Sequence, residues 1–135
     1  MITGRCYCGL TRITARCAPQ VITYCHCTDC RRASGAPVSV FAAFSSEDVT
    51  FEPSLGVPAS AAPSAKRWFC SGCGSSVASQ YDYLPGQIYV AVGLLDQAAE
   101  LAPQGHAHFD QALSWLHVAD DLPKTKGSAR ESLKR

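Results

Sequence analysis

The spacing of the cysteines is the feature that most limits how this chain can fold. Eight of the 135 residues are cysteine, and seven of them fall into three short clusters. The clusters are Cys6-Tyr7-Cys8-Gly9, Cys25-His26-Cys27-Thr28-Asp29-Cys30 and Cys70-Ser71-Gly72-Cys73-Gly74. Cysteines that lie one or two residues apart, in groups repeated at distant points of a chain, are typical of zinc sites. The pattern therefore predicts a fold organised around bound metal.

Disulfide bonds are the main alternative, and two observations count against them. Two cysteines separated by one residue have a poor geometry for a disulfide. The N-terminal residues form no apolar segment of signal-peptide length, and no apolar run approaches the roughly 20 residues of a membrane span. We therefore expect a cytoplasmic protein with reduced thiols and no membrane contact. A redox role for C-x-x-C would call for a βαβ context that the sequence lacks.

A closed four-thiolate site takes two cysteine pairs from distant parts of the chain. Cys70 and Cys73 form one pair, and Cys6 and Cys8 are the pair that remains once the middle cluster is set aside. The glycine after each pair lets backbone amides turn toward the sulfurs. We predict a structural zinc on these four cysteines, which contributes on the order of several kcal/mol to folding.

The middle cluster offers three ligands, Cys25, Cys27 and Cys30, within six residues. A metal with three protein ligands and an open fourth position is the pattern of catalytic zinc. The alternative is a second structural site, closed by Cys17 or by one of the four histidines, His26, His106, His108 and His117.

An open site of this kind favours chemistry on a thiol. Three thiolates and Zn²⁺ sum to −1, so the metal is a weaker Lewis acid than zinc held by three imidazoles. It suits a soft fourth ligand such as a substrate thiol, whose pKa it would lower. The sequence therefore predicts a reaction of a small thiol at this site.

The rest of the sequence reads as short β-type runs punctuated by glycine and proline. We predict strands over residues 10–17, 21–24, 38–44, 49–52, 66–69, 75–79, 88–92 and 106–109. Ile88, Val90 and Val92 should share one buried face. One short helix is expected over 28–34, with Thr28 as its N-cap and Gly35 just past its end. A further turn of helix is expected over 97–101.

The composition indicates one globular domain, over residues 1–122, because 47% of the residues are hydrophobic and only 17% are charged. The following segment, 123–135, is a basic tail that we expect to be mobile. Without the five basic residues and one acidic residue from position 124 onward, the body has a net charge of −3, a poor match for nucleic-acid phosphates. Residues 53–65 form a Pro- and Ala-rich loop that is either a lid or a mobile connection.

Four motifs, taken in order, resemble one protein family. They are Gly4-x-Cys6-x-Cys8-Gly9, Cys25-His26-Cys27-x-x-Cys30-Arg31-Arg32-x-Ser34-Gly35-Ala36-Pro37, Arg67-x-Phe69-Cys70-x-x-Cys73-Gly74-Ser75 and Gly93-x-Leu95-Asp96. From about Gly4 to Trp115, the chain is similar to the glutathione-dependent formaldehyde-activating family, which also includes the centromere protein V group. The loop over 53–65 departs from the more aromatic and polar character of that family.

The resemblance implies a mainly β fold, a zinc-stabilised β-tent made of small antiparallel sheets with little helix. It implies the same partition of the metal ligands, with a structural zinc on the four cysteines and a catalytic, exchangeable zinc on Cys25, Cys27 and Cys30. The family's namesake reaction joins glutathione to formaldehyde and gives S-hydroxymethylglutathione; it is classed as a carbon–sulfur lyase reaction. A small thiol and an aldehyde would then be the partners.

Several other residues carry expectations. Arg31 and Arg32 are candidates to bind the carboxylates of glutathione, and the alternative is a solvated helix face. Cys17 is expected to be a small buried residue. Arg67 is expected in packing or a salt bridge. His106 and His108 would share one face of a strand, near the open zinc. Tyr89, Phe109 and Trp115 are expected in the core.

Three functions compete on this reading. The first is a zinc-dependent carbon–sulfur lyase, for the reasons above. The second is a non-catalytic module, in which two zinc ions stabilise a β domain for structural or protein-interaction purposes. The third, a zinc ribbon for nucleic acid, is the weakest, because the body of the chain is acidic.

Overall fold

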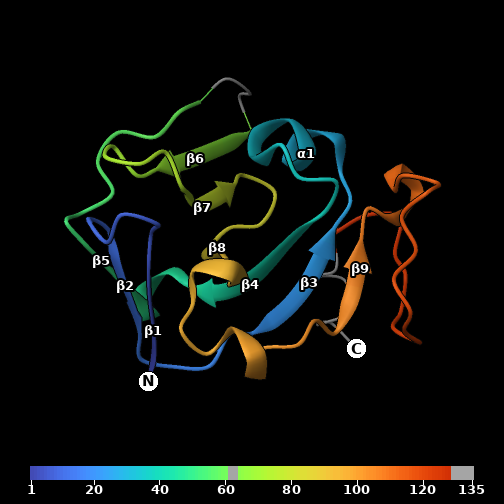
Figure 1. Ribbon diagram of the computed structural model, residues 1–135, viewed down its shortest axis with the longest axis horizontal. Coiled ribbons are helices and arrows are strands. Elements are labelled where there is room, and N and C mark those ends of the chain that lie inside the picture. The colour runs from blue at the N-terminus through green and yellow to red at the C-terminus, as the bar shows by residue number, and fades with distance from the viewer. Residues whose placement is uncertain (61–63, 129–135) are drawn as a thin grey trace.

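The computed structural model describes residues 1–60 and 64–128, which form two β-sheets (Figure 1). The smaller sheet has the strand order β1 (Ile2–Arg5), β2 (Arg12–Ala15) and β5 (Val49–Glu52). The larger sheet has the order β6 (Ala65–Phe69), β7 (Ser76–Tyr81), β8 (Gln87–Ala91), β4 (Ser39–Ser45), β3 (Val21–Cys25) and β9 (Gly105–Ala107). The mainly β fold expected from the sequence is thereby confirmed.

Helices are few and short, as expected. The one α-helix of the described residues is α1 (Thr28–Ser34). Single 3-10 turns complete the connections: η1 (Ser46–Asp48), η2 (Val92–Leu94), η3 (Ala98–Glu100) and η4 (Phe109–Gln111). In the part of the chain that is described, no helix is long and apolar enough to cross a membrane.

The alternation of side chains along the strands divides the hydrophobic residues between the two faces of the larger sheet. One face packs against the smaller sheet and forms what we call the inter-sheet core. Its buried members are Cys6, Ile13, Ala15, Ile22, Ala42, Phe44, Cys70, Val77, Ala78, Ile88, Val90, Val92 and Leu95. The expected face of Ile88, Val90 and Val92 is confirmed. Truncation of Phe44, which has no exposed surface, would cost about 3–5 kcal/mol.

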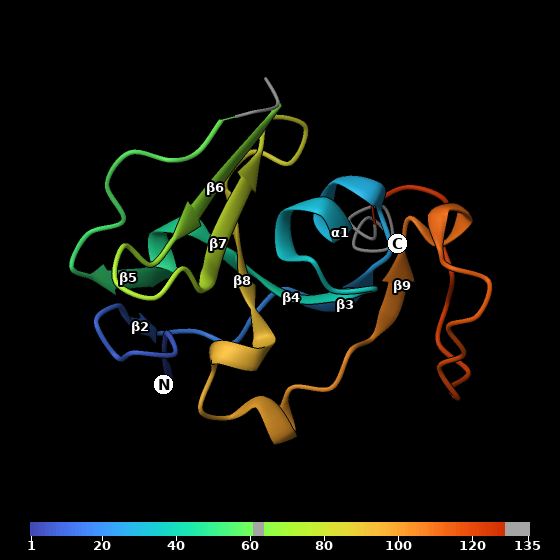
Figure 2. The same cartoon turned by 45° about the horizontal axis from the view of Figure 1, so that its top comes forward.

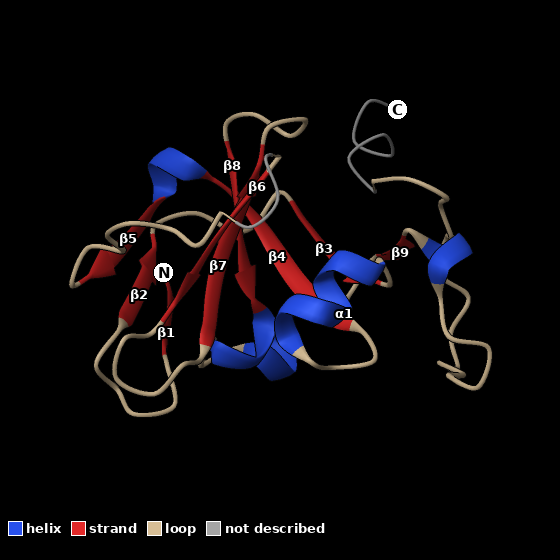
Figure 3. Cartoon of the chain, turned by 90° about the horizontal axis from the view of Figure 1, so that it is seen from above, coloured by secondary structure: helices blue, strands red, loops and turns tan. Residues whose placement is uncertain are grey.

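The opposite face of the larger sheet forms a second cluster, the helix-side core. It comprises Val21, Cys25, Cys30, Phe41, Ala43, Leu84 and Tyr89. Figure 2 shows α1 lying against β3 and β4 on this side, and Figure 3 shows the smaller sheet and β9 at opposite sides of the molecule. Each core contains cysteines of a different cluster, so the two clusters are built on opposite faces of one sheet.

Helix α1 has the predicted bounds, but its N-cap is one residue earlier than expected. The sulfur of Cys27 accepts a hydrogen bond from the backbone N–H of Cys30 at 3.2 Å. The N–H of Thr28 instead donates to the side-chain oxygen of Gln111 at 2.9 Å. The helix ends as predicted at Gly35, which has a φ of 75° and donates its N–H to the carbonyl of Arg31.

Eight strands lie where the sequence predicts them, to within a few residues, and β1 is an addition. Its sequence, Ile-Thr-Gly-Arg, is too short and too mixed to signal a strand, yet Gly4 pairs with Ile13 of β2. Glycine is needed at this position, because a Cβ on Gly4 would collide with the carbonyl oxygen of Leu94. The need for glycine at position 4 comes from Leu94, which is 90 residues away, so no local sequence pattern reveals it.

The larger sheet is not purely antiparallel, because β9 pairs with β3 in parallel, with Tyr24 opposite His106 and Cys25 opposite Ala107. Parallel neighbours cannot be joined by a tight turn. These two strands are separated by most of the chain, which leaves room for the long connection that a parallel pair needs. The prediction of antiparallel sheets was therefore wrong for the pairing of β3 with β9.

Two segments expected to be loop or tail contact the larger sheet. Residues 123–127 run along β9, and His106 donates its N–H to the carbonyl of Pro123 and accepts the N–H of Thr125, both at 2.9 Å. At the other edge, Ala59 exchanges two backbone hydrogen bonds with Arg67 of β6. Residues 61–63 of the loop and 129–135 of the tail lie outside the described residues, and the domain boundary near 122 stays a prediction.

Candidate metal centres and active site

The four-cysteine cluster brings together Cys6, Cys8, Cys70 and Cys73, whose sulfurs all lie within 4.8 Å of one another. The Cys6 sulfur is 3.4 Å from that of Cys70 and 3.6 Å from that of Cys8. Zinc bound tetrahedrally, with Zn–S bonds of about 2.3 Å, separates its sulfurs by roughly 3.8 Å. The donor set therefore fits a closed metal site. All four cysteines are free thiols in this structure, not disulfides.

The turns that carry these cysteines also supply hydrogen bonds to the sulfurs. Thr11 donates its backbone N–H to Cys6 and Gly72 donates its own to Cys70, each at 3.3 Å. The hydroxyl of Ser75 lies 3.1 Å from the sulfur of Cys73. Hydrogen bonds from the side chain and the backbone of Ser75 lower the pKa of Cys73 to about 5. Such contacts favour the thiolate form that binds metal.

The three-cysteine cluster lies where β3 runs into α1. Cys25 ends the strand, Cys27 caps the helix and Cys30 lies in its first turn. The Cys25 sulfur is 3.5 Å from each of the other two. No fourth cysteine, histidine or carboxylate joins this group within residues 1–60 and 64–128. The sequence raised the alternative that Cys17 or a histidine closes the site. Among the described residues, neither does so.

The pKa shifts of the cysteines in the three-cysteine cluster indicate that their sulfurs would bind a cation. Contacts with the sulfurs of Cys27 and Cys30 raise the pKa of Cys25. Hydrogen bonds with Cys25 and Cys27, aided by the positive charge of Arg67, lower the pKa of Cys30 to about 2. Three thiolates this close repel one another, and a soft divalent cation would remove that repulsion. The residues present therefore fit a metal ion with three protein ligands.

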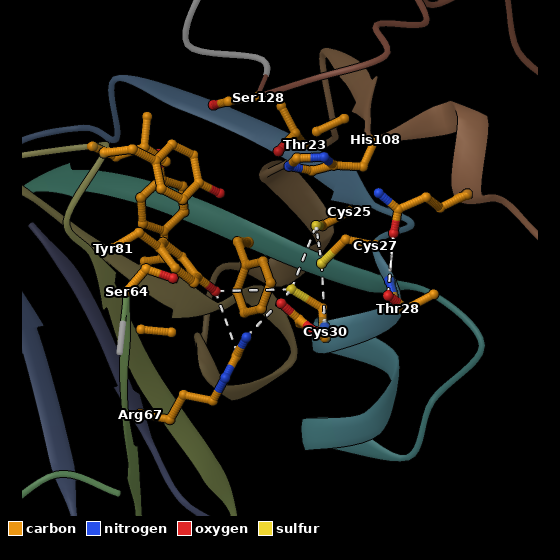
Figure 4. Close-up of a pocket in the computed structure, with 18 of the residues that line it drawn as sticks. Thr23, Cys25, Cys27, Thr28, Cys30, Ser64, Arg67, Tyr81, His108 and Ser128 are labelled. Carbon is orange, nitrogen blue, oxygen red and sulfur yellow. Dashed lines mark hydrogen bonds between the residues drawn. The ribbon is translucent and has the colours of Figure 1, made fainter. Parts of the chain in front are cut away.

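A cavity of about 210 Å³ opens from this cluster on the helix side of the larger sheet (Figure 4). Its walls come from β3, β4, β6, β7, β8, β9, α1 and the segments that follow β7 and β9. The lining residues are Val21, Thr23, Cys25, Cys27, Thr28, Asp29, Cys30, Phe41, Ser64, Ala65, Arg67, Tyr81, Tyr83, Leu84, Tyr89, Ala107, His108, Gln111 and Ser128. The cluster is thus open to a small ligand.

Arg67 and Tyr81 form the polar wall of this cavity. Arg67 donates to the hydroxyl of Tyr81 at 3.3 Å, and its other terminal nitrogen lies 3.9 Å from the sulfur of Cys30 (Figure 4). Ser79 also donates to the hydroxyl of Tyr81, at 3.0 Å. Burial raises the pKa of Tyr81, so the phenol stays neutral. The sequence suggested only a packing or salt-bridge role for Arg67 and did not predict its position at the cavity wall beside Cys30.

The sheet register explains how these residues reach the site. Arg67 lies opposite Ser79, and Ala65 opposite Tyr81, on the face that also carries Cys25. Alternation within each strand was available from the sequence, but the pairing of β6 with β7 was not. Tyr83 was missed as well; it lines the cavity although 55% of its surface is exposed.

Arg31 and Arg32 lie elsewhere. Both line a separate groove beside the end of α1, together with Gly35 and Leu113 among others, and neither lines the cavity. Asp29 does line the cavity. A role of the two arginines in binding glutathione stays a prediction.

Three other expectations need correction. Cys17 is exposed in the bend that follows β2, beyond the last paired residue of the strand. Trp115 is 63% exposed in the connection after η4, where no sheet face covers it. His106 and His108 do not share a face, because β9 ends at Ala107 and His108 adopts a left-handed φ of 52°. His108 lines the cavity, whereas His106 is buried behind the cluster.

The fold and these sites define a mainly β protein with two cysteine clusters that can hold metal ions, one of them open to a cavity. The sequence profile of the family described as glutathione-dependent formaldehyde-activating enzyme matches residues 1–111. The chain belongs to this family, and the resemblance seen in the sequence is confirmed. The family suggests glutathione-dependent activation of formaldehyde.

Two further comparisons add to this assignment. No curated protein matches the chain. Among solved structures, the chain is similar to the crystal structure of a Rhodobacter sphaeroides protein that was a structural genomics target. The two share 21% identity over 91% of this chain and 99% of that chain, with a TM-score of 0.56. At this identity, the likeness shows a shared fold.

Proposed function

We propose that this protein is a zinc-dependent carbon–sulfur lyase that joins a small thiol, such as glutathione, to an aldehyde, such as formaldehyde. The observation that carries the proposal is the three-cysteine cluster, which opens into a cavity and has no fourth ligand among the described residues. A site of three ligands beside a cavity leaves room for a substrate to bind the metal. The family to which the chain belongs supports the choice of glutathione and formaldehyde.

The two clusters would have different roles. Cys6, Cys8, Cys70 and Cys73 would hold a structural zinc, because they form a closed set of four ligands. Cys25, Cys27 and Cys30 would hold the catalytic zinc, which is exchangeable because one position is left to the substrate. Reduced thiols at both clusters are compatible with the cytoplasmic location that we propose.

When bound, the catalytic zinc lowers the pKa of the substrate thiol and holds it as a thiolate. The protein side chains provide the rest of the site. Arg67 places a positive charge beside the sulfur of Cys30, which offsets the net negative charge of three thiolates and one zinc ion. Side chains from β4 and β8, including Phe41 and Tyr89, line the cavity and limit the access of water.

The addition forms a C–S bond and converts the aldehyde carbonyl into a hydroxyl. Negative charge develops on the carbonyl oxygen as the sulfur attacks, and the proton lost by the thiol ends on that oxygen. The neutral hydroxyl of Tyr81 and the guanidinium of Arg67 are hydrogen-bond donors at the cavity wall that can stabilise this oxygen. Arg31 and Arg32 remain proposed contacts for glutathione carboxylates that extend beyond the cavity.

Exchange NMR with ¹³C-formaldehyde and glutathione tests the proposal, because it measures the rates of adduct formation and breakdown at equilibrium. The wild-type protein loaded with two zinc ions should accelerate exchange at least about tenfold over the uncatalysed reaction. C30S should lose this acceleration and retain one zinc ion. C17S, which alters an exposed thiol outside both clusters, is the matched control and should behave as wild type.

Two outcomes would contradict the proposal. Wild-type protein that binds two zinc ions but leaves the exchange rate unchanged would favour the alternative, a non-catalytic structural or protein-interaction module. Full acceleration by C30S would show that catalysis, if present, does not use the three-cysteine cluster.

A further inference from the structure

A hydrogen-bonded chain of three side chains, two of them buried, lies behind the three-cysteine cluster and has no part in the proposed reaction. Nε2 of His26 is 2.8 Å from Nδ1 of His106, and Nε2 of His106 is 2.9 Å from a carboxylate oxygen of Asp120. Both histidines are only 1% exposed. Two imidazoles are costly to bury, so their arrangement with the partly exposed Asp120 calls for a physical reason.

The position of His26 relates this chain to the metal site. His26 lies between the ligands Cys25 and Cys27, and its ring is hydrogen-bonded away from the cavity that both cysteines line. Its backbone N–H also donates to the carbonyl of Ala107 at 3.1 Å. Any rotation of the backbone at His26 would change the 3.5 Å separation of the two flanking sulfurs. The hydrogen bond of its side chain therefore limits how far the two ligands can move.

Aromatic packing holds the two rings in one orientation. Tyr24 stacks on His106 with a centroid distance of 4.6 Å, and the rings of His106 and His26 meet edge to edge at their hydrogen bond, with their planes inclined by 24°. Phe109 packs its edge against both imidazoles. This packing limits the rotation of both imidazole rings. A displacement of Asp120 at one end of the chain therefore changes the position of His26 at the other end.

The carboxylate sets the direction of the hydrogen bonds. The hydrogen bond with His106 lowers the pKa of Asp120, so the carboxylate is ionised and accepts from Nε2–H of His106. When the ring of His106 carries its proton on Nε2, its Nδ1 is an acceptor for Nε2–H of His26. This leaves a lone pair, not an N–H, on the buried Nδ1 of His26, which has no partner. A buried N–H without an acceptor would be the costlier arrangement.

Asp120 lies in a segment beyond the 1–111 match with the family profile. This segment pairs with both backbone groups of His106, through Pro123 and Thr125, and Asp120 itself accepts the N–H of Leu122 at 3.0 Å. The carboxylate is therefore held in place by its own segment and reaches the strand next to the metal ligands.

We propose that His26, His106 and Asp120 are positioning residues for the three-cysteine metal site. Through Asp120, the segment after residue 111 then helps to hold the metal ligands in place. The inference depends on the metal proposed above for this cluster, and it does not depend on the thiol–aldehyde reaction. Removal of either end of the chain frees the backbone between Cys25 and Cys27. The metal then leaves this cluster faster, while the four-cysteine cluster on the opposite face of the sheet is unaffected.

Zinc release to a colorimetric chelator, followed in time on the full chain loaded with two zinc ions, tests the proposal without any substrate. Wild type should release one ion in a fast phase and one in a slow phase. D120A should accelerate the fast phase about 10- to 100-fold, the range typical for partners that orient metal ligands. H26F, which keeps a ring of similar shape but removes both nitrogens, should do the same. The slow phase should not change in either variant.

Two further variants separate positioning from general stability. D120N keeps an oxygen that accepts from His106 and should release the fast ion at close to the wild-type rate. D121A alters the adjacent, exposed carboxylate and is the matched control. If D120A does not fold, H26F decides the question by the same criterion.

The outcomes distinguish this proposal from the proposed function. A fast phase that is unchanged in D120A and H26F overturns the positioning role alone. Equal acceleration of both phases, with a lower thermal midpoint, also overturns it, because the chain would then only stabilise the fold. A wild-type protein that takes up a single zinc ion overturns both proposals.

Discussion

The two cysteine clusters differ in how much of the chain each one joins. Cys6 and Cys70 lie 64 residues apart, and their cluster ties the loop after β1 to the loop after β6 at the inter-sheet core. Cys25 and Cys30 are only five positions apart and lie at the helix-side core, next to a cavity. A cross-link over a long loop removes much more entropy from the unfolded chain than one over a short loop. The first cluster is therefore suited to stabilise the fold, whereas exchange of a metal ion bound at the second would cost the fold little.

Substitution C70S should give the largest difference between the two clusters. It removes a buried ligand of the four-cysteine cluster, and metal binding at such sites contributes on the order of 10 kcal/mol, as much as the whole stability of a typical domain. We expect the variant to lose its cooperative thermal transition in calorimetry, whereas C30S keeps one. A C70S protein that melts cooperatively within a few degrees of wild type would show that the clusters do not differ in this way.

Substitution R67M sharpens the comparison at the cavity. Arg67 lies against Cys30 and Tyr81, so its loss should lower kcat/KM for the thiol–aldehyde reaction roughly 10- to 100-fold, or about 1.5–3 kcal/mol. Both zinc ions and the thermal midpoint should be retained. K66Q is the control, because Lys66 is exposed and precedes Arg67 on a strand whose successive side chains point to opposite faces. Equal losses in R67M and K66Q would argue against a role of the cavity wall.

Substitution G4A tests the support of the four-cysteine cluster from the smaller sheet. The added Cβ collides with the carbonyl oxygen of Leu94 and must displace backbone, which should lower the free energy of unfolding by about 1–3 kcal/mol. Chemical denaturation measures the change. G93A, where a Cβ meets nothing within 4 Å, is the matched control. The fast phase of zinc release, which we assign to the opposite face of the sheet, should stay as in wild type.

Substitution S75A should give the smallest effect, confined to the four-cysteine cluster. Ser75 lowers the pKa of Cys73, so its removal raises that pKa and lets protons compete better with metal for the sulfur. The slowly released zinc should therefore dissociate at a higher pH on acidification, with an affinity lower by about tenfold. S71A, an exposed serine of the same turn, serves as control. A downward shift of the release pH would contradict the assigned direction.

The parts of the fold that local spacing determines could be predicted from the sequence. The division of the cysteines into groups of four and three matches the two groups of sulfurs, and the bounds of α1 follow from its flanking residues. Strand β5 was predicted to the residue, because Val49 to Glu52 combine β-branched and aromatic residues between turn signals.

The parts that depend on contacts between distant residues could not be predicted. Arg67 and Tyr81 reach the cavity only through the register of β6 with β7, and β9 lies beside β3 only after a long excursion of the chain. The pairing of His26 with His106 follows from that same parallel register. The general preference of apolar residues for the interior also failed at Trp115, which is exposed despite its size.

Both outer strands of the larger sheet are flanked by chain that is not itself a strand. Ala59 occupies the open side of β6 through two hydrogen bonds with Arg67, and residues 123–127 occupy the open side of β9 through His106 and its neighbours. Unpaired strand edges are templates on which other chains add strands and aggregate. By covering these positions, the two segments protect a sheet of six strands from edge-to-edge association. Truncation ahead of residue 123 would therefore expose one edge and favour aggregation.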